Sequence, residues 1–259
     1  DMKFILIGDH KQLPAVVRQS EEESAVDDPQ LRAIGLDNCR QSLFERLLRQ
    51  EREAGRTEFV GVLNRHGRMH PAIAAWPSHM FYAREQLQPV PLPHQLEESE
   101  APRLRFVNTP VRGDIDPPLA EARLTAQLLA EVYERYRQQF SVQKTVGIIV
   151  PYRSQIALIR QEINRLHLPE LLDISIDTVE RYQGSQRDVI IYSFAVTHRY
   201  QLDFLTANTF YEDGHPIDRK LNVALTRARC ELILIGYEPV LRQDALFANL
   251  IDYIRSLKP

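Results

Sequence analysis

The run Thr145–Val150 (TVGIIV) constrains the fold of this chain more than any other stretch of its sequence. Its residues are apolar or β-branched, which is typical of a central strand of a parallel sheet, buried on both faces. Helices separate it from six further expected strands, near residues 2–8, 58–63, 104–108, 174–179, 188–196 and 230–236. This alternation predicts an α/β fold in which helices cover both faces of a parallel sheet.

The segment Leu221–Arg229 (LNVALTRAR) is predicted to be a helix that leads into the last strand. The apolar members of one face recur at helical spacing: Leu221, Ala224, Leu225 and Ala228. They predict one narrow buried stripe, and Arg227 lies about a third of a turn away from it, so its side chain is expected to reach outward. Taken alone, Arg227 and Arg229 are more simply explained as cations that cap a helix C-terminus.

Other helices are expected over residues 41–53, 71–80, 119–136 and 244–257, and after Pro151. Residues 197–218 are polar and rich in turn-forming residues, so we expect a surface excursion there. Two cysteines far apart in sequence, Cys39 and Cys230, indicate neither a disulfide framework nor a zinc site, and no metal site is expected in the chain itself.

Composition restricts the partners. The formal net charge of −3 gives no global attraction to nucleic acid, so any such binding must come from a local patch. No apolar run is long enough to span a bilayer and no signal-peptide pattern opens the chain. We therefore expect no membrane partner, and a cytoplasmic protein, or a nuclear one in a eukaryote.

Three segments carry a resemblance to a known family. LNVALTRAR resembles a hallmark of superfamily-one helicases, of the branch that includes the nonsense-mediated-decay helicase and the Okazaki-fragment helicase-nuclease. The resemblance implies that Arg227 is an arginine finger on the γ-phosphate of ATP. GDHKQLP (8–14) resembles the family's GDxxQLPPV, which implies that Gln12 lies beside the same phosphate. HGRMHP (66–71) is similar to QYRMHP and implies that Arg68 is a second cation there.

Two more segments add to this resemblance. TVERYQGSQRD (178–188) resembles TVDxYQGxExD, which implies that Thr178 touches the nucleic-acid backbone. In the same element Gly184 keeps the loop tight against the nucleotide, and Gln186 stands where an acidic residue binds ribose hydroxyls. PYRSQ (151–155) resembles an element of the nucleic-acid channel, and a strand phosphate is expected near Tyr152 and Ser154, at a helix N-terminus.

The sequence departs from the family at two of these positions. Gly67 replaces a tyrosine that stacks on adenine, which removes an aromatic face of a kind worth about 1–3 kcal/mol in base stacking. Gln186 can bond a hydroxyl but offers no charged acceptor, so we expect a weaker contact.

The resemblance implies a RecA-like P-loop NTPase fold. Residues 1–40 would be the tail end of a first RecA-like domain with its linker, and residues 41–259 the second RecA-like domain. Since ligand sites of such sheets lie at the carboxyl ends of strands, all the singled-out residues are expected there.

The sequence contains no G-x-x-x-x-G-K-[ST] and no Gly-Lys pair. We therefore expect the phosphate cradle, its lysine and the Mg²⁺ ligands to precede Asp1, in an N-terminal RecA-like domain of the same protein. The chain would be the C-terminal half of an ATP-dependent helicase, inactive as an ATPase alone. It would use ATP with Mg²⁺, bind single-stranded DNA or RNA, and move 5′ to 3′ as its relatives do.

Two alternatives remain open. The first is a non-catalytic nucleic-acid-binding or scaffold module that keeps the helicase fold, which Gly67 and Gln186 favour. The second, a free-standing metabolic α/β enzyme, lacks a nucleophile, metal or dinucleotide pattern in the sequence.

Overall fold

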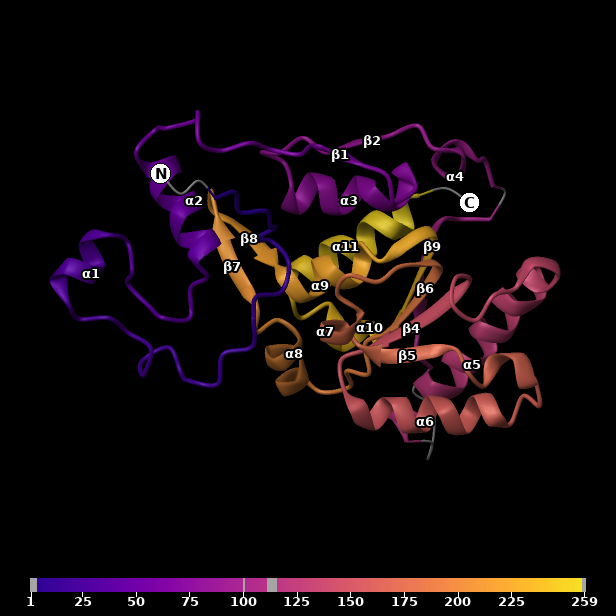
Figure 1. The fold of residues 1–259 in the computed structure, drawn as a ribbon. Coiled ribbons are helices and arrows are strands. Elements are labelled where there is room, and N and C mark those ends of the chain that lie inside the picture. The colour runs from indigo at the N-terminus through magenta and orange to yellow at the C-terminus, as the bar shows by residue number, and fades with distance from the viewer. Residues whose placement is uncertain (1–3, 100, 111–115, 258–259) are drawn as a thin grey trace. The chain divides into compact units, whose positions relative to one another are not determined.

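The computed structural model describes residues 4–99, 101–110 and 116–257, and the chain divides into two compact units, residues 1–63 and 64–259 (Figure 1). The first unit holds helices α1 (Pro29–Ala33) and α2 (Leu43–Glu53). α2 begins where Ser42 Oγ accepts a hydrogen bond from the Glu45 amide, and Gly55, with φ of 68°, follows its end. The helix predicted over residues 41–53 is thereby confirmed. The predicted domain division after residue 40 stays a prediction.

A five-stranded parallel sheet is the centre of the second unit, with strand order β3-β9-β6-β4-β5. Its strands are β3 (Leu104–Asn108), β4 (Val146–Val150), β5 (Ser175–Thr178), β6 (Arg187–Ser193) and β9 (Ala228–Gly236). β4 pairs with β5 on one side and β6 on the other, and all five of its residues are buried. The central, doubly covered strand predicted from TVGIIV is confirmed.

Helices cover both faces of this sheet, as the alternation predicted (Figure 1). α5 (Pro117–Tyr136) and α6 (Arg153–Asn164) pack on one face, against alternate residues of the strands such as Ile148, Ile191 and Ile233. The other face carries α3 (Pro71–Phe81), α9 (Arg219–Leu225) and α11 (Ala245–Ser256).

Short elements complete the second unit. β1 (Arg65–His66) pairs in parallel with β2 (Gln88–Pro89), and α4 (Pro93–Leu96) follows. α7 (Val179–Tyr182) is a single turn between β5 and β6. α10 (Glu238–Leu241) precedes α11, and two 3₁₀ turns lie at Arg137–Gln139 and Pro169–Leu171.

Two predicted strands are wrong within the described residues. Residues 4–8 and 58–63 form no strand there, and residues 2–3 of the first prediction lie outside the described part. Apolar, β-rich composition favours extended backbone, but a strand also needs a neighbour for its hydrogen bonds. In the second run, the Val60 amide instead donates to the Thr57 carbonyl at 3.2 Å and closes a turn.

The polar stretch 197–218 is more ordered than the sequence predicted. It forms α8 (Arg199–Leu205) and an antiparallel hairpin of β7 (Thr209–Glu212) and β8 (His215–Asp218). Asp213 and Gly214 supply the positive φ angles of the hairpin turn, at 51° and 78°. Leu202 and Leu205 are buried and anchor α8.

The helix predicted from LNVALTRAR is shorter and more deeply buried than expected. α9 ends at Leu225, and Ala228 already belongs to β9. The four residues of the predicted stripe are all buried, which confirms that face, but residues 220, 222 and 223 are buried as well, so the burial is not confined to one narrow stripe. Asn222 lies off that stripe and is buried with its amide donating to Tyr82 Oη at 2.8 Å. Among the described residues, no helix is both long and apolar enough to cross a membrane.

Candidate functional site

The sequence-predicted residues of the second unit lie at two opposite edges of the sheet. Gln186 and Arg227 directly precede β6 and β9, at what we call the amino edge. Tyr152 and Thr178 lie at the ends of β4 and β5, at the carboxyl edge, where Val150 and Thr178 are register partners. The expectation that all of them share the carboxyl ends is wrong.

α7 explains this separation. After β5 the chain makes one helical turn back along the sheet, and Tyr182 Oη donates to the carbonyl of Ser175, the first residue of β5. Tyr182 also lies over Gly147, where a Cβ atom would come within 2.1 Å of Tyr182 Oη. Because Gly147 leaves this space, the loop with Gly184 and Gln186 reaches the amino edge before β6 begins.

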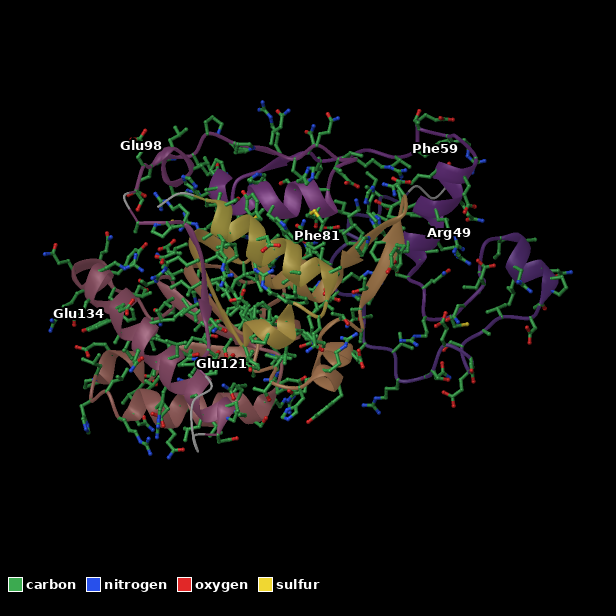
Figure 2. The ribbon with its side chains drawn as sticks, turned by 180° about the vertical axis from the view of Figure 1, so that it is seen from behind. Arg49, Phe59, Phe81, Glu98, Glu121 and Glu134 are labelled. Carbon is green, nitrogen blue, oxygen red and sulfur yellow. The ribbon has the colours of Figure 1, made fainter. Side chains whose placement is uncertain are left out.

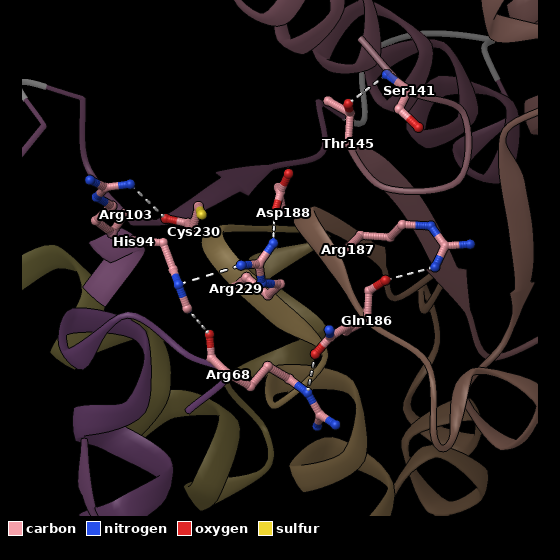
Figure 3. A network of polar contacts seen from close by, with 10 residues as sticks. All are labelled: Arg68, His94, Arg103, Ser141, Thr145, Gln186, Arg187, Asp188, Arg229 and Cys230. Carbon is pink, nitrogen blue, oxygen red and sulfur yellow. Dashed lines mark hydrogen bonds and ion pairs between the residues drawn. The ribbon is translucent and has the colours of Figure 1, made fainter. Parts of the chain in front are cut away.

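Arg68 joins the amino edge from a distant part of the chain (Figure 3). Its Nε donates to Gln186 Oε1 at 2.9 Å and its Nη1 donates to the Thr226 carbonyl at 3.1 Å. Three predicted elements, around Arg68, Gln186 and Arg227, therefore meet at one place. Burial lowers the pKa of Arg68, although a guanidinium stays protonated at neutral pH.

Residues that the sequence did not single out hold Arg68 in position. The Gln95 amide donates to the carbonyls of His66 and Met69, at 3.1 and 2.9 Å, and His94 Nε2 lies 2.8 Å from the Arg68 carbonyl. The His70 amide donates to the Arg229 carbonyl at 2.7 Å, which ties the same loop to β9. No local pattern in the Pro-rich stretch indicated this role, because the contacts join residues far apart in sequence.

A second pair of charges lies beside this network. Arg229 Nη1 contacts Asp188 Oδ1 at 2.6 Å, and Arg229 Nη2 lies 3.4 Å from His94 Nδ1 (Figure 3). Arg229 thus links β9, β6 and α4. Its prediction as a helix cap does not describe this position, because Arg229 lies within β9.

Arg227 is buried, with only 1% of its surface exposed. Its Nη2 donates to Thr226 Oγ1 at 3.1 Å, and its carbonyl accepts from the Arg187 amide at 3.2 Å. The prediction of an outward-reaching side chain is wrong. Arg227 lies beyond the helix, whose C-cap is Thr226, so helical spacing did not apply to it.

The two glycines of the predicted nucleotide elements differ. Gly184 has φ of 87° and nothing within 4 Å of a would-be Cβ atom, so glycine is favoured there by its backbone. At Gly67 a Cβ atom would lie 3.1 Å from Leu92 Cδ1. The aliphatic Leu92 side chain therefore lies where a side chain at position 67 would begin.

The carboxyl edge is more open. Tyr152 is half-buried at the N-cap of α6, its Oη donates to the Gln201 carbonyl at 3.3 Å, and burial raises its pKa. Ser154 is exposed in the first turn of α6, and Thr178 is half-buried at the N-cap of α7. Gln12 belongs to the first unit, where its Nε2 donates to Asp9 Oδ2 at 3.0 Å.

A buried carboxyl group at the carboxyl edge escaped the sequence analysis. Glu121 of α5 (Figure 2) accepts at Oε1 from Ser193 Oγ, at 2.6 Å, and from the Ala195 amide, at 2.7 Å. Thr109 Oγ1 donates to its other oxygen at 3.1 Å, and burial raises the pKa of Glu121 to about 7. One sequence signal could have indicated its burial: Glu121 lies seven residues before Leu128, on the same face of the predicted helix, and both are buried.

In the described part of the chain, no group of three or more His, Cys, Asp or Glu side chains is placed so that it could hold a metal ion. The amino edge instead offers guanidinium groups, which suit phosphate or carboxylate oxygens.

A family model described as an AAA domain matches residues 39–239 of this chain. Similar curated relatives include an uncharacterised ATP-dependent helicase of Methanocaldococcus jannaschii, 28% identical over 99% of this chain and 35% of its own length. Regulator of nonsense transcripts 1 of Dictyostelium discoideum is 29% identical over 98% of this chain and 18% of its own length.

A DNA replication ATP-dependent helicase/nuclease of Xenopus laevis is 28% identical over 98% of this chain and 24% of its own length. The chain therefore spans about a third or less of the length of these relatives.

Proposed function

Because the chain belongs to the AAA domain family, and its relatives include proteins named as ATP-dependent helicases, we propose that it is the second RecA-like domain of an ATP-dependent DNA or RNA helicase. Residues 41–259 form that domain in this proposal, and residues 1–40 are the end of the first RecA-like domain with its linker. The reaction is ATP hydrolysis coupled to movement along a single strand, in the 5′ to 3′ direction.

The hydrogen bonds of Arg68 carry this proposal. They join Arg68 to Gln186 and to the carbonyl of Thr226, which precedes Arg227. Residues from three segments that resemble helicase motifs thus gather at one edge. Arg68 is 118 residues away from Gln186 in the sequence and 158 residues away from Thr226. Packing of the sheet alone gives no reason for Arg68 to reach the carbonyl of the residue before Arg227.

The amino edge suits the polyphosphate of a nucleotide. Arg68 donates hydrogen bonds through Nε and Nη1 to groups among the described residues. Its third nitrogen, Nη2, remains available to a phosphate oxygen. In this proposal Arg68 and Arg227 stabilise the negative charge of the transition state, a role worth about 10³–10⁵ in rate for arginine fingers. Because Arg227 is buried in this structure, its guanidinium must become accessible to the phosphate when ATP is bound. Gln12 lies beside the γ-phosphate in this proposal, and Gly184 and Gln186 contact the nucleotide.

The chain needs a partner for this chemistry. The sequence contains no G-x-x-x-x-G-K-[ST], so the phosphate cradle and the Mg²⁺ ligands belong to an N-terminal RecA-like domain in this proposal. Mg²⁺ neutralises phosphate charge when bound. The single strand binds at the carboxyl edge, where Thr178, Tyr152 and Ser154 contact its backbone.

A non-catalytic nucleic-acid-binding or scaffold module is the second candidate. Two observations favour it. Gln186 Oε1 accepts from Arg68 Nε, so this acceptor is directed at the arginine and not at a ribose hydroxyl. Leu92 beside Gly67 also gives the nucleotide an aliphatic surface where the family has tyrosine.

Steady-state ATP hydrolysis separates the two candidates. In the longer protein, Arg227→Ala is expected to abolish ATPase activity stimulated by nucleic acid while binding of a single-stranded oligonucleotide persists. The 259-residue chain alone is expected to hydrolyse no ATP. Unchanged hydrolysis and binding in Arg227→Ala would support the scaffold, and turnover by the isolated chain would contradict the assignment as a half-motor.

Because Arg227 is buried, its removal can also destabilise the fold. Arg227→Lys keeps the charge and most of the volume, and its thermal unfolding is measured alongside. Arg137→Ala is the matched control, since Arg137 is exposed and forms an ion pair only three residues away, with the exposed Glu134. It is expected to leave both activities unchanged.

A further inference from the structure

A row of exposed aromatic side chains lies on and beside α8, at the carboxyl edge. Tyr200 is 70% exposed and stacks on His198, with ring centroids 5.7 Å apart and an interplanar angle of 29°. Phe204, one helical turn further, is 49% exposed and stacks on Tyr152 at 5.1 Å and 25°. Rings this exposed contribute little to the core, whose contacts in α8 come from Leu202 and Leu205.

The two stacked pairs have different roles. Tyr152 and Phe204 hold α8 against the N-terminus of α6, and Tyr152 Oη also donates to the Gln201 carbonyl. The centroid of the Phe204 ring in addition lies 4.3 Å from Lys220 Nζ, so Phe204 contacts both a ring and a cation. Tyr200 and His198 are supported by this arrangement but leave a flat aromatic surface open to solvent.

Charges around the row suit a polyanion. Lys220 is a buried cation between Phe204 and Glu180, and its Nζ lies 3.1 Å from the Glu180 carboxylate. Arg199 is exposed next to Tyr200, 3.7 Å from Asp203, and Arg153 is exposed in the first turn of α6. Exposed ion pairs of this kind are weak and can exchange partners with a phosphate.

We propose that Tyr200 is a base-stacking platform for single-stranded nucleic acid, with His198 continuing the stack and Arg199 and Arg153 beside the backbone. Every base has a flat π-face, so aromatic platforms with flanking cations bind single strands without reading their sequence. The inference rests on the proposed function, since the strand phosphates expected near Tyr152 and Ser154 bring a strand to this place. It adds an element from the stretch 197–218 to the interface.

Equilibrium binding of the 259-residue chain to a single-stranded oligonucleotide containing 2-aminopurine tests this inference, with separate DNA and RNA versions. Stacking quenches the fluorescence of 2-aminopurine. Tyr200→Ala is expected to weaken binding about 5- to 150-fold, the range of one lost stacking contact, and to remove the quenching. Tyr200→Phe, which keeps the ring, is expected to restore both.

Tyr211→Ala is the matched control, because Tyr211 is 73% exposed on β7 and outside the row. Wild-type affinity and quenching in Tyr200→Ala would overturn the inference and leave the proposed function intact. Failure of the wild-type chain to bind either oligonucleotide would overturn the inference, while ATP hydrolysis by the longer protein separately decides the proposed function. Self-association that Tyr200→Ala abolishes, without quenching in the wild type, would identify a second copy of the chain as the occupant.

Discussion

The amino and carboxyl edges of one sheet differ in how they hold their side chains. At the amino edge, Arg68 and Arg229 are held by hydrogen bonds and an ion pair to groups from other elements, and Arg227 is buried. At the carboxyl edge, Ser154 and Tyr200 are exposed to solvent.

The difference corresponds to the ligands we propose. A triphosphate carries a high and localised charge, so a guanidinium group that is already held in place, such as that of Arg68, stabilises its transition state with little reorganisation. A single strand is flexible and varies in sequence, and exposed rings and exposed cations can adapt to it.

The largest expected effect comes from removing a fixed charge at the amino edge. In the longer protein, Arg68→Ala is expected to lower kcat for ATP hydrolysis by about 10³-fold or more, because a transition-state cation is lost. The Kd for a single-stranded oligonucleotide is expected to stay within about twofold. Thr178→Val, at the carboxyl edge, is expected to raise that Kd and to preserve kcat at saturating oligonucleotide. Equal losses of both properties in either variant would break the distinction between the edges.

A smaller effect is expected from Glu121, the buried carboxyl group of the carboxyl edge. Its pKa is raised from 4.5 to about 7, so between these pH values the folded chain holds a proton that the unfolded chain has lost. The free energy of unfolding therefore falls as pH rises through this window, by about 3 kcal/mol in total. Glu121→Gln removes the titration; its amide oxygen can still accept from Ser193 Oγ and the Ala195 amide, and its NH₂ group can donate to Thr109 Oγ1.

Urea unfolding at pH 5 and pH 8 measures this difference. Fluorescence of Trp76, the single tryptophan, reports on the second unit. We expect equal stabilities at pH 5 and a more stable Glu121→Gln at pH 8. Asp218, whose pKa burial also raises to about 7, titrates in both proteins and cancels from the comparison. A wild type that gains stability from pH 5 to pH 8 relative to the variant would contradict this account.

The smallest expected effect tests how α7 separates the edges. Gly147→Ala places a methyl group within 2.1 Å of Tyr182 Oη, and relieving this overlap is expected to cost about 1–3 kcal/mol in unfolding free energy. Gly61→Ala is the control, because a Cβ there has nothing within 4 Å, and thermal unfolding compares the two. An unchanged melting temperature in Gly147→Ala would mean that Tyr182 does not fix the path of α7.

The sequence predicted what local patterns can encode. Apolar runs located β4, β6 and β9, and helical spacing located α5 and α11. It failed where long-range contacts decide, as at residues 58–63, whose extended propensity finds no pairing partner among the described residues.

The site follows the same division. Motifs identified Arg68, Gln186 and Arg227, but the edge of the sheet at which Gln186 lies depends on the return path of α7 over Gly147. No motif pointed to Gln95 or Glu121. Their hydrogen bonds to His66, Met69 and Ser193 join residues more than twenty positions apart in sequence. Helical spacing misplaced Arg227, because α9 ends at Leu225, three residues before Ala228, the last residue of the predicted stripe.

The single turn of α7 also limits how this protein can change during evolution. Only seven residues separate Thr178 at one edge from Gln186 at the other, and Glu180 within them pairs with Lys220 at the start of α9. Surface loops commonly tolerate insertions. An insertion between these two residues would shift the register of the loop against Arg68 and strand β6 together. We therefore expect the length of this segment to stay fixed among functional homologues, while the hairpin of β7 and β8 varies freely.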